Sequence, residues 1–297
     1  MHDAGLPPGA LNLISCRAQD APAVVTAIIE HPAVRKINFT GSTAVGRQIA
    51  RTCGANLKPS LMELGGKNSA IVCADADVDT AVHGVLAGAL LNSGQICMST
   101  DRILVHADIA ERFLGAMKAA LAEQAEKATL AGEEPPTLVN RASKTRVQGL
   151  VSRALDAGAY LVHDNGVSRA LGEDSDEKEV RMPPAILAGV TRDMAVWQEE
   201  NFASLASCLV VSGDDEAVRI ANEGGYGLSA AVFTEDLRRG FALARRIQTG
   251  AVHINSMTVH DEPVLPHGGV KESGWGRFNA AQGLEEFLVS KSVTWMD

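Results

Sequence analysis

The sequence lacks paired cysteines, an excess of basic residues and any long apolar run. Its five cysteines contain no C-x-x-C pair and their number is odd. We therefore expect neither a disulfide framework nor a zinc site, and a reducing compartment fits best. Lys and Arg number 27 against 36 Asp and Glu, which argues against nucleic acid or an anionic membrane as a partner. With no signal pattern and no apolar run that would span a bilayer, we expect a soluble, cytoplasmic protein.

What the chain does contain is a regular alternation of structure types. Its 297 residues are 46% hydrophobic, which is enough to bury a sizeable core. Short β-type apolar runs alternate with helix-period segments, and this predicts an α/β fold with a largely parallel sheet. The predicted strands are 35–40, 69–73, 102–106, 208–212, 229–234 and 251–255. The predicted helices are 21–30, 43–52, 78–91, 109–127, 144–157, 215–223 and 237–248.

Three segments fall outside this alternation. Residues 132–136 and the charge run 172–178 are typical of surface loops. Residues 285–295 are rich in β-forming residues, so we expect either an added edge strand or a strand that pairs with another subunit. A doubly wound dinucleotide fold normally begins with its own first strand and helix, but here a Gly/Pro-rich loop and one βα unit precede the first motif.

The first motif is the turn at residues 39–46, Phe-Thr-Gly-Ser-Thr-Ala-Val-Gly, between a predicted strand and a predicted helix. Free N–H groups at a helix start suit a phosphate, and Gly41 would let it approach. The pattern is neither G-x-G-x-x-G nor a Walker loop. An ordinary helix cap by Ser42 explains the same residues, so both interpretations stay open.

The second motif is Glu63-Leu64-Gly65-Gly66. A carboxylate beside two glycines is placed as a general base would be, where backbone can approach a ligand. The alternative is a loop glutamate whose neighbouring glycines only satisfy the geometry of a turn.

The third motif places Cys97 in a glycine-containing loop after a long amphipathic helix. A lone cysteine is most often a small buried hydrophobe. A cysteine in such a loop is a better candidate for a nucleophile, and the other four lack this setting, so we interpret them as structural. Two further patterns are weak alone: Glu200 two residues before Phe202, and the Pro/Gly-rich loop at residues 265–274.

These five motifs, in this order, resemble the aldehyde dehydrogenase superfamily, and the resemblance covers essentially the whole chain. It implies an aldehyde dehydrogenase-like α/β fold, with a parallel-sheet catalytic domain at 66–270. Residues 1–65 would be an incomplete Rossmann-type cofactor domain, and 271–297 a C-terminal segment with an oligomerisation strand. It also implies NAD, with NADP as the alternative, a small-molecule aldehyde as substrate and a homo-oligomer.

The resemblance also implies roles for single residues. Cys97 would be the nucleophile, and Glu63 the general base. The other matched positions would contact the cofactor: Gly41 and Ser42 the pyrophosphate, Val45 the adenine, Leu64 the nicotinamide amide, Glu200 the nicotinamide ribose and Phe202 the nicotinamide ring.

The chain departs from the family pattern in three places. Ala203-Ser204 stands where the family usually has Gly-Pro, and His267 replaces the aromatic residue of the late Pro-Phe-Gly-Gly loop. The family's first cofactor strands and its oxyanion-hole asparagine would precede residue 1. We expect an aldehyde dehydrogenase sequence that is a fragment, a truncated gene model or a degenerate copy, the alternative being a non-catalytic remnant or a subunit-interaction protein.

Residues 258–269 resemble the loop of salicylaldehyde- and vanillin-type enzymes, which favours an aromatic aldehyde. Glu63 as base argues against a CoA-acylating relative.

Overall fold

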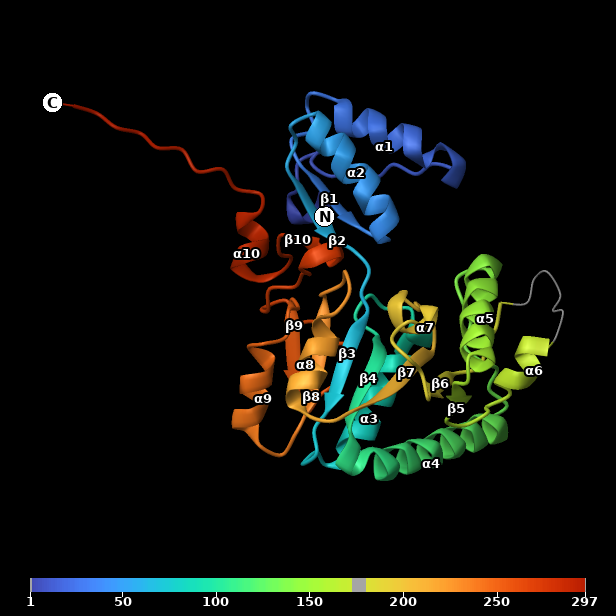
Figure 1. The fold of residues 1–297 in the computed structure, drawn as a ribbon. Coiled ribbons are helices and arrows are strands. Elements are labelled where there is room, and N and C mark those ends of the chain that lie inside the picture. The colour runs from blue at the N-terminus through green and yellow to red at the C-terminus, as the bar shows by residue number, and fades with distance from the viewer. Residues whose placement is uncertain (1, 173–179, 297) are drawn as a thin grey trace.

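The computed structural model describes residues 2–172 and 180–296 and shows an α/β protein with two sheets (Figure 1). A parallel α/β architecture was predicted from the alternating pattern, and this is confirmed. In the described part of the chain, no helix has the length and apolar character needed to cross a bilayer. The charge run at 173–178 lies outside the described residues.

The larger sheet has seven strands in the order β5-β6-β7-β4-β3-β8-β9, and every neighbouring pair is parallel except β5 and β6. Two of the strands, β5 and β6, were not predicted. The strands are β3 (Asn68–Val72), β4 (Thr100–His106), β5 (Tyr160–Leu161), β6 (Ala185–Ala188), β7 (Leu205–Val211), β8 (Ser229–Phe233) and β9 (Ala251–Ile254).

Helices cover both faces of this sheet, which is why its strands are mostly apolar. Alternate residues of β3 point to opposite sides: Ile71 joins one buried cluster and Ala70 and Val72 the other. The first face packs against α5 (Arg141–Asp156), α7 (Ala195–Gln198), α8 (Asp214–Asn222) and α9 (Leu237–Ala244). The second face packs against α3 (Val78–Leu90) and α4 (Ala107–Ala131). The short α6 (Val167–Gly172) adds to the first cluster.

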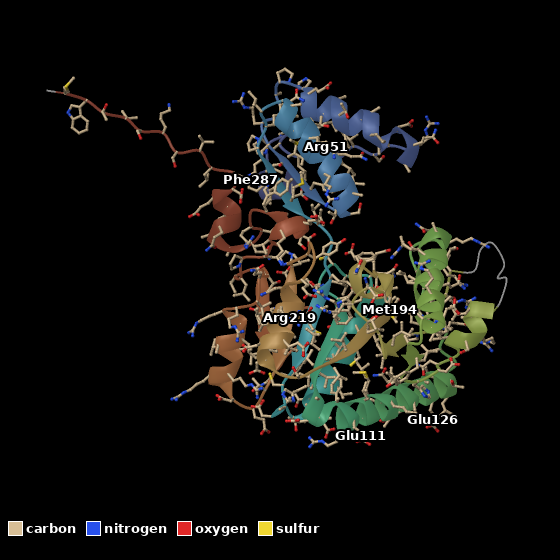
Figure 2. All side chains as sticks on the ribbon, viewed as in Figure 1. Arg51, Glu111, Glu126, Met194, Arg219 and Phe287 are labelled. Carbon is tan, nitrogen blue, oxygen red and sulfur yellow. The ribbon has the colours of Figure 1, made fainter. Side chains whose placement is uncertain are left out.

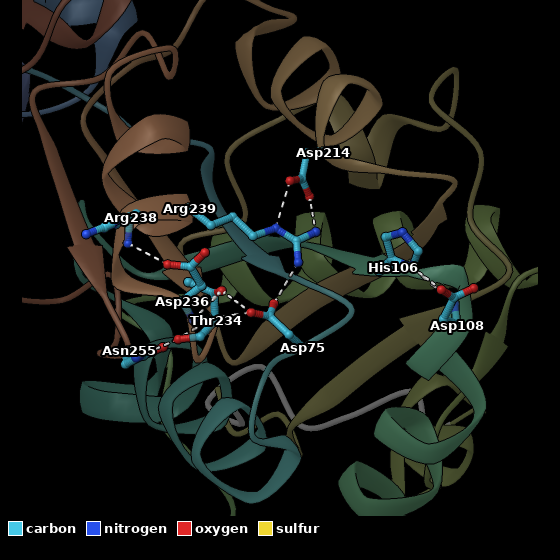
Figure 3. A network of polar contacts seen from close by, with 9 residues as sticks. All are labelled: Asp75, His106, Asp108, Asp214, Thr234, Asp236, Arg238, Arg239 and Asn255. Carbon is cyan, nitrogen blue, oxygen red and sulfur yellow. Dashed lines mark hydrogen bonds and ion pairs between the residues drawn. The ribbon is translucent and has the colours of Figure 1, made fainter.

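A polar network fastens α9 to the end of β3 and to α8 (Figure 3). The Arg239 guanidinium donates to both oxygens of Asp214 at 2.6 and 2.8 Å and to Asp75 at 2.8 Å. Asp75 also accepts from the hydroxyl of Thr234, which follows β8, at 2.7 Å. These contacts join three segments that are distant in the sequence.

The smaller sheet carries a lobe of its own above the larger sheet in Figure 1. Its order is β1-β2-β10, with β1 parallel and β10 antiparallel to β2. The strands are β1 (Ile37–Thr40), β2 (Ser60–Glu63) and β10 (Gly274–Trp275), and the helices are α1 (Ala21–Glu30) and α2 (Thr43–Ala55). Short 3₁₀ turns lie at His2–Ala4, Ala18–Asp20, Leu91–Gly94 and Lys271–Ser273.

The predicted edge strand at 285–295 is wrong for the described residues. Helix α10 (Ala280–Glu285) occupies its start, and the residues after Phe287 run away from the body of the protein (Figures 1 and 2). Phe287 itself stays at the small lobe, where the Lys36 ammonium lies 5.2 Å from its ring centre. A segment with high β propensity forms no strand without a neighbouring backbone to bond. The alternative, pairing with another subunit, stays a prediction.

Candidate active site

A cavity of about 770 Å³ lies between the two sheets, at the carboxyl ends of β1 and β2. Carboxyl ends of parallel strands are where α/β proteins usually bind ligands. The structure brings most of the predicted site residues together in its lining: Gly41, Ser42, Glu63, Leu64, Cys97, Glu200 and Phe202. Val45 is the exception. It lies on the first turn of α2 with 45% of its surface exposed and does not line the cavity.

The turn before α2 is held in place by backbone bonds and close packing. The Gly41 N–H donates to the Glu63 carbonyl at 3.1 Å. A Cβ on Gly41 would come within 2.6 Å of the Phe39 ring, so a larger residue would require this ring to move. Ser42 caps the helix by accepting from the Val45 N–H at 3.4 Å. The capping interpretation of this motif is therefore confirmed, and phosphate binding by the same turn stays a prediction.

The two glycines after Glu63 are needed because other groups fill the space beside them. A Cβ on Gly65 would lie 2.4 Å from a carboxylate oxygen of Glu200, and one on Gly66 would lie 2.4 Å from the Cys97 carbonyl. The Gly66 N–H donates to Glu200 Oε1 at 3.0 Å. The turn thus brings the Glu200 carboxylate and the cysteine loop against one stretch of backbone.

Burial is the main influence on Glu200. It raises the pKa of this carboxyl group to about 7, even though the Gly66 N–H, Lys67 and Arg146 favour the charged form. A carboxyl group whose pKa lies near neutral pH is typical of functional sites, although structural ion-pair networks produce such shifts too.

The cysteine loop has a backbone that few residues tolerate. Asn92 and Ser93 have φ values of 50° and 58°, and Gly94 has 66°. A Cβ on Gly94 would lie 2.0 Å from the Ala203 carbonyl oxygen, so only glycine fits. This tight turn ends the segment after α3 and places Cys97 at the cavity instead of in the core.

Asn68 anchors the same loop, although no motif in the sequence singled it out. Its buried amide donates to the carbonyls of Cys97 and Ser99, each at 2.8 Å. Its oxygen accepts from the Ser229 N–H at 3.0 Å. Strand β3 therefore fixes the position of the cysteine backbone through one side chain.

Cys97 and Glu63 face each other across a partly buried space. Together with His267, they place one ligand atom each within 4.8 Å of the others. Burial, and next the negative charge of Glu63, raise the pKa of the Cys97 thiol well above its usual value. The Met98 N–H acts in the opposite direction. The negative charge of Glu63 therefore disfavours the thiolate form of Cys97.

His267 is the residue that the sequence marked only as a departure from the family pattern. Its Nε2 lies 3.5 Å from Glu63 Oε1, and its side chain is 15% exposed. The contact is an ion pair when the histidine is charged, but it is too long for a good hydrogen bond. Glu63 Oε1 accordingly has no hydrogen-bond partner among the described residues, although Glu63 is only 4% exposed.

Two further residues hold the segment that carries Glu200 and Phe202. The buried Lys67 ammonium donates to the Val196 carbonyl at 2.9 Å and to Asn201 Oδ1 at 3.0 Å. Burial lowers its pKa to about 8. Arg146, from α5, donates to the Glu200 carbonyl at 2.9 Å. Neither residue was predicted, because each acts through contacts between segments far apart in the chain.

The remaining cysteines differ in their surroundings. Cys53, Cys73 and Cys208 are buried, as expected of structural cysteines, and burial raises the pKa of each thiol. The structural interpretation is wrong for Cys16, which is exposed on the N-terminal segment. Cys97 alone lines the cavity with Glu63.

Comparison with known proteins agrees with these observations. The chain is 42% identical to a vanillin dehydrogenase from a Pseudomonas species over 99% of its length, and 38% identical to a salicylaldehyde dehydrogenase from Pseudomonas putida. It spans 59% of the length of each of these relatives. The crystal structure of a salicylaldehyde dehydrogenase from Pseudomonas putida, complexed with salicylaldehyde, superposes with a TM-score of 0.85 at 35% identity, covering 96% of this chain and 57% of the other.

The family comparison covers nearly all of the sequence. The pattern of the aldehyde dehydrogenase family matches residues 1–293. The resemblance first noted from five ordered motifs is thereby confirmed, and so is the aldehyde dehydrogenase-like fold. The chain belongs to the aldehyde dehydrogenase family.

Proposed function

We propose that this chain carries the nucleophile, the base and part of the cofactor site of an enzyme that oxidises an aldehyde to a carboxylic acid. The observation that carries the proposal is the approach of the Cys97 sulfur and the Glu63 carboxylate within 4.8 Å, at a cavity that Glu200 and Phe202 also line. A thiol nucleophile with a carboxylate in reach is the arrangement that covalent catalysis requires.

The reaction follows from these two side chains. The Cys97 thiol loses its proton to solvent, and the thiolate attacks the carbonyl carbon of the aldehyde to give a tetrahedral thiohemiacetal oxyanion. NAD or NADP bound in the cavity would supply the hydride acceptor that this carbon needs to become a thioester on Cys97. Glu63 then removes a proton from water, which attacks the thioester and releases the acid. The covalent route splits one difficult oxidation into two easier steps.

The cavity suits the nicotinamide end of such a cofactor. Glu200 offers an acceptor for ribose hydroxyls, and its carboxylate occupies space that a side chain at Gly65 would fill. Leu64, Phe202 and the turn of Gly41 and Ser42 line the same cavity. We propose NAD as the cofactor and NADP as the alternative.

The substrate class is inferred from the relatives and the late loop. Several similar proteins are named for aromatic aldehydes: vanillin, salicylaldehyde and benzaldehyde dehydrogenases. The order Thr258, His260, Asp261, Glu262 followed by His267 gave the same expectation from the sequence. We propose an aromatic aldehyde as the substrate.

A second candidate is a role in subunit assembly without catalysis. The observation that favours it is the exposed apolar tail after α10, where Val289 is 94% and Trp295 is 83% exposed. Such a segment suits pairing with a second copy of the chain or a related subunit. The two candidates differ in whether the purified protein turns over aldehyde.

The test is aldehyde oxidation with NAD and with NADP, comparing benzaldehydes with medium-length aliphatic aldehydes. We expect measurable turnover with higher kcat/KM for the aromatic substrates, and loss of turnover in Cys97→Ser. Cys16→Ser is the matched control because Cys16 is exposed and lies outside the cavity. Near-normal turnover in Cys97→Ser would refute the nucleophile assignment. A folded protein that forms dimers but has no turnover would favour the second candidate.

A further inference from the structure

Glu63, Cys97 and His267 form a cluster of three different metal-binding side chains. They come from the end of β2, the loop before β4 and the loop before β10, so no sequence spacing links them. One ligand atom from each lies within 4.8 Å of the other two. No zinc site was predicted because the sequence has no local cysteine pairs. A metal site whose ligands are brought together by the fold needs no such pairs.

The backbone at each of the three residues is held in place before any ligand arrives. His267 exchanges two backbone hydrogen bonds with Phe278, at 2.9 and 2.7 Å, and its ring lies 6.4 Å from the Phe278 ring. Asn68 fixes the Cys97 backbone at 2.8 Å. Glu63 ends β2 and is 4% exposed. The backbone therefore needs little rearrangement on binding, which favours affinity.

One polar atom of the cluster lacks a partner. Glu63 Oε1 is buried with no hydrogen bond, and the nearest donor on the neighbouring histidine is 3.5 Å away. A buried polar atom without a bond is costly and marks a place where a ligand or ion fits. A cation between Glu63 and His267 would satisfy both side chains.

The donor set selects the metal. Thiolate sulfur, imidazole nitrogen and carboxylate oxygen together are typical of Zn²⁺, whereas Ca²⁺ and Mg²⁺ take oxygen ligands. Zinc–ligand distances of about 2.0 to 2.3 Å require the three atoms to approach by roughly 1 Å, within reach of side-chain rotation. Three protein ligands leave a fourth tetrahedral position open to water.

We propose that Glu63, Cys97 and His267 bind one Zn²⁺ ion reversibly and that this ion holds the active site in an inactive form. Binding transfers the thiol proton of Cys97 to solvent and forms a zinc–sulfur bond, with no change of oxidation state. The sulfur and the carboxylate are then unavailable for reaction with an aldehyde. Zinc binding itself requires neither cofactor nor substrate, so the site can be tested apart from the proposed oxidation.

The first measurement is calorimetric titration of ZnCl₂ into the full chain, without cofactor or aldehyde. We expect one ion per chain, and at least a roughly tenfold loss of affinity in His267→Phe, because losing a ligand should cost no less than losing a residue that only hydrogen-bonds to a ligand. Phenylalanine is the family's usual residue type here, and His267→Gln is a second variant should the first fail to fold. Equal Zn²⁺ affinity in folded wild type and either variant would overturn the proposal.

His260→Phe is the matched control. His260 pairs with Glu262 at 3.0 Å, and its ring centre lies 5.0 Å from that of His253. These three side chains are the alternative to which a Zn²⁺ ion could bind. We expect this variant to bind Zn²⁺ as the wild type does. If His260→Phe lost Zn²⁺ binding and His267→Phe kept it, the ion would bind near His260 and not at Glu63, Cys97 and His267. That result would refute the assignment.

Alkylation gives a second readout that does not depend on turnover. Iodoacetamide labelling with peptide mapping should show that Zn²⁺ slows modification of Cys97 but not of the exposed Cys16. The protection should be reversed by a chelator and weakened in His267→Phe. Equal labelling of Cys97 with and without Zn²⁺ would contradict coordination by its sulfur.

Discussion

Glu200 lines the cavity with a carboxyl group whose pKa burial raises from 4.5 to about 7. In the unfolded chain, the same group would titrate near its ordinary value. Between these two pKa values, the folded protein binds more protons than the unfolded one. The free energy of unfolding therefore falls as pH rises from about 4.5 through 7, and this cost is fully present above pH 7.

Glu200→Gln removes the buried charge but keeps an oxygen that can accept from the Gly66 N–H. At pH 8, we expect the variant to unfold with a free energy up to about 3 kcal/mol larger than that of the wild type, since one pKa unit corresponds to about 1.4 kcal/mol. The gain should shrink as pH falls toward 5. Urea unfolding at pH 5, 6, 7 and 8 measures it, with exposed Glu199→Gln as the neighbouring control. A stability difference that does not change with pH would contradict the shifted titration.

Single residues also show how far the sequence could predict the site. Cys97 and Glu63 stood out because a cysteine in a glycine loop and a carboxylate beside two glycines are chemical signals within short stretches. Asn68 and Lys67 carried no such signal, since their roles depend on the carbonyl of Cys97 and the amide of Asn201. His267 was noted as a departure, but its distance to Glu63 is a property of the folded chain.

At the scale of elements, helix α9 is joined to the large sheet by the Arg239 network (Figure 3). The Arg239 side chain is 26% exposed, and its partners Asp75 and Asp214 are 32% and 30% exposed. Burial would raise the pKa of Asp75, but the Thr234 hydroxyl and Arg239 outweigh it and hold this pKa below its usual value. The network is thus more than an isolated surface ion pair.

Arg239→Gln should leave both carboxylates without their cation. We expect a loss of about 1 to 3 kcal/mol in the free energy of unfolding, between the values for exposed and buried pairs. Arg238→Gln is the matched control on the same helix turn, because its side chain contacts neither Asp75 nor Asp214 in Figure 3. Thermal unfolding of both variants compares them directly. Equal destabilisation by the two substitutions would show that the network contributes nothing specific.

Helices and strands were predictable where their apolar residues repeat within one short stretch of sequence. Helix α1 occupies Ala21–Glu30, as the pattern predicted, and five of the seven strands of the larger sheet coincide with predicted β-type runs. Strand β2 was missed because Ser60–Glu63 is only four residues long and runs into a Gly-Gly turn. Its strand character comes from pairing with β1, a contact that no short sequence window contains.

At the scale of the whole molecule, the site exists because two lobes are docked. Glu63 belongs to the small sheet, and Cys97 precedes a strand of the large one. Ser273 ties the lobes together: its hydroxyl donates to the Gly65 carbonyl at 2.7 Å and accepts from the Gly227 N–H at 2.9 Å. The distance between nucleophile and base is therefore set by packing between the lobes.

Two roles define the proposed active site: Cys97 is the nucleophile, and Glu63 is the base that activates water to hydrolyse the acyl group from Cys97. Removing the Glu63 charge also removes one of the causes that raise the pKa of Cys97, so acylation should survive in Glu63→Gln while hydrolysis slows. An activated p-nitrophenyl ester tests this without any cofactor, because acyl transfer to sulfur needs no oxidation.

The decisive measurement is time-resolved intact mass and peptide mapping after ester addition to wild type, Glu63→Gln, Cys97→Ser and Cys16→Ser. We predict one acyl group on Cys97 that turns over in the wild type and in Cys16→Ser, accumulates in Glu63→Gln and is absent in Cys97→Ser. An acyl group on another residue would contradict Cys97 as the nucleophile. Equal lifetimes of the acyl-cysteine in wild type and Glu63→Gln would contradict Glu63 as the base.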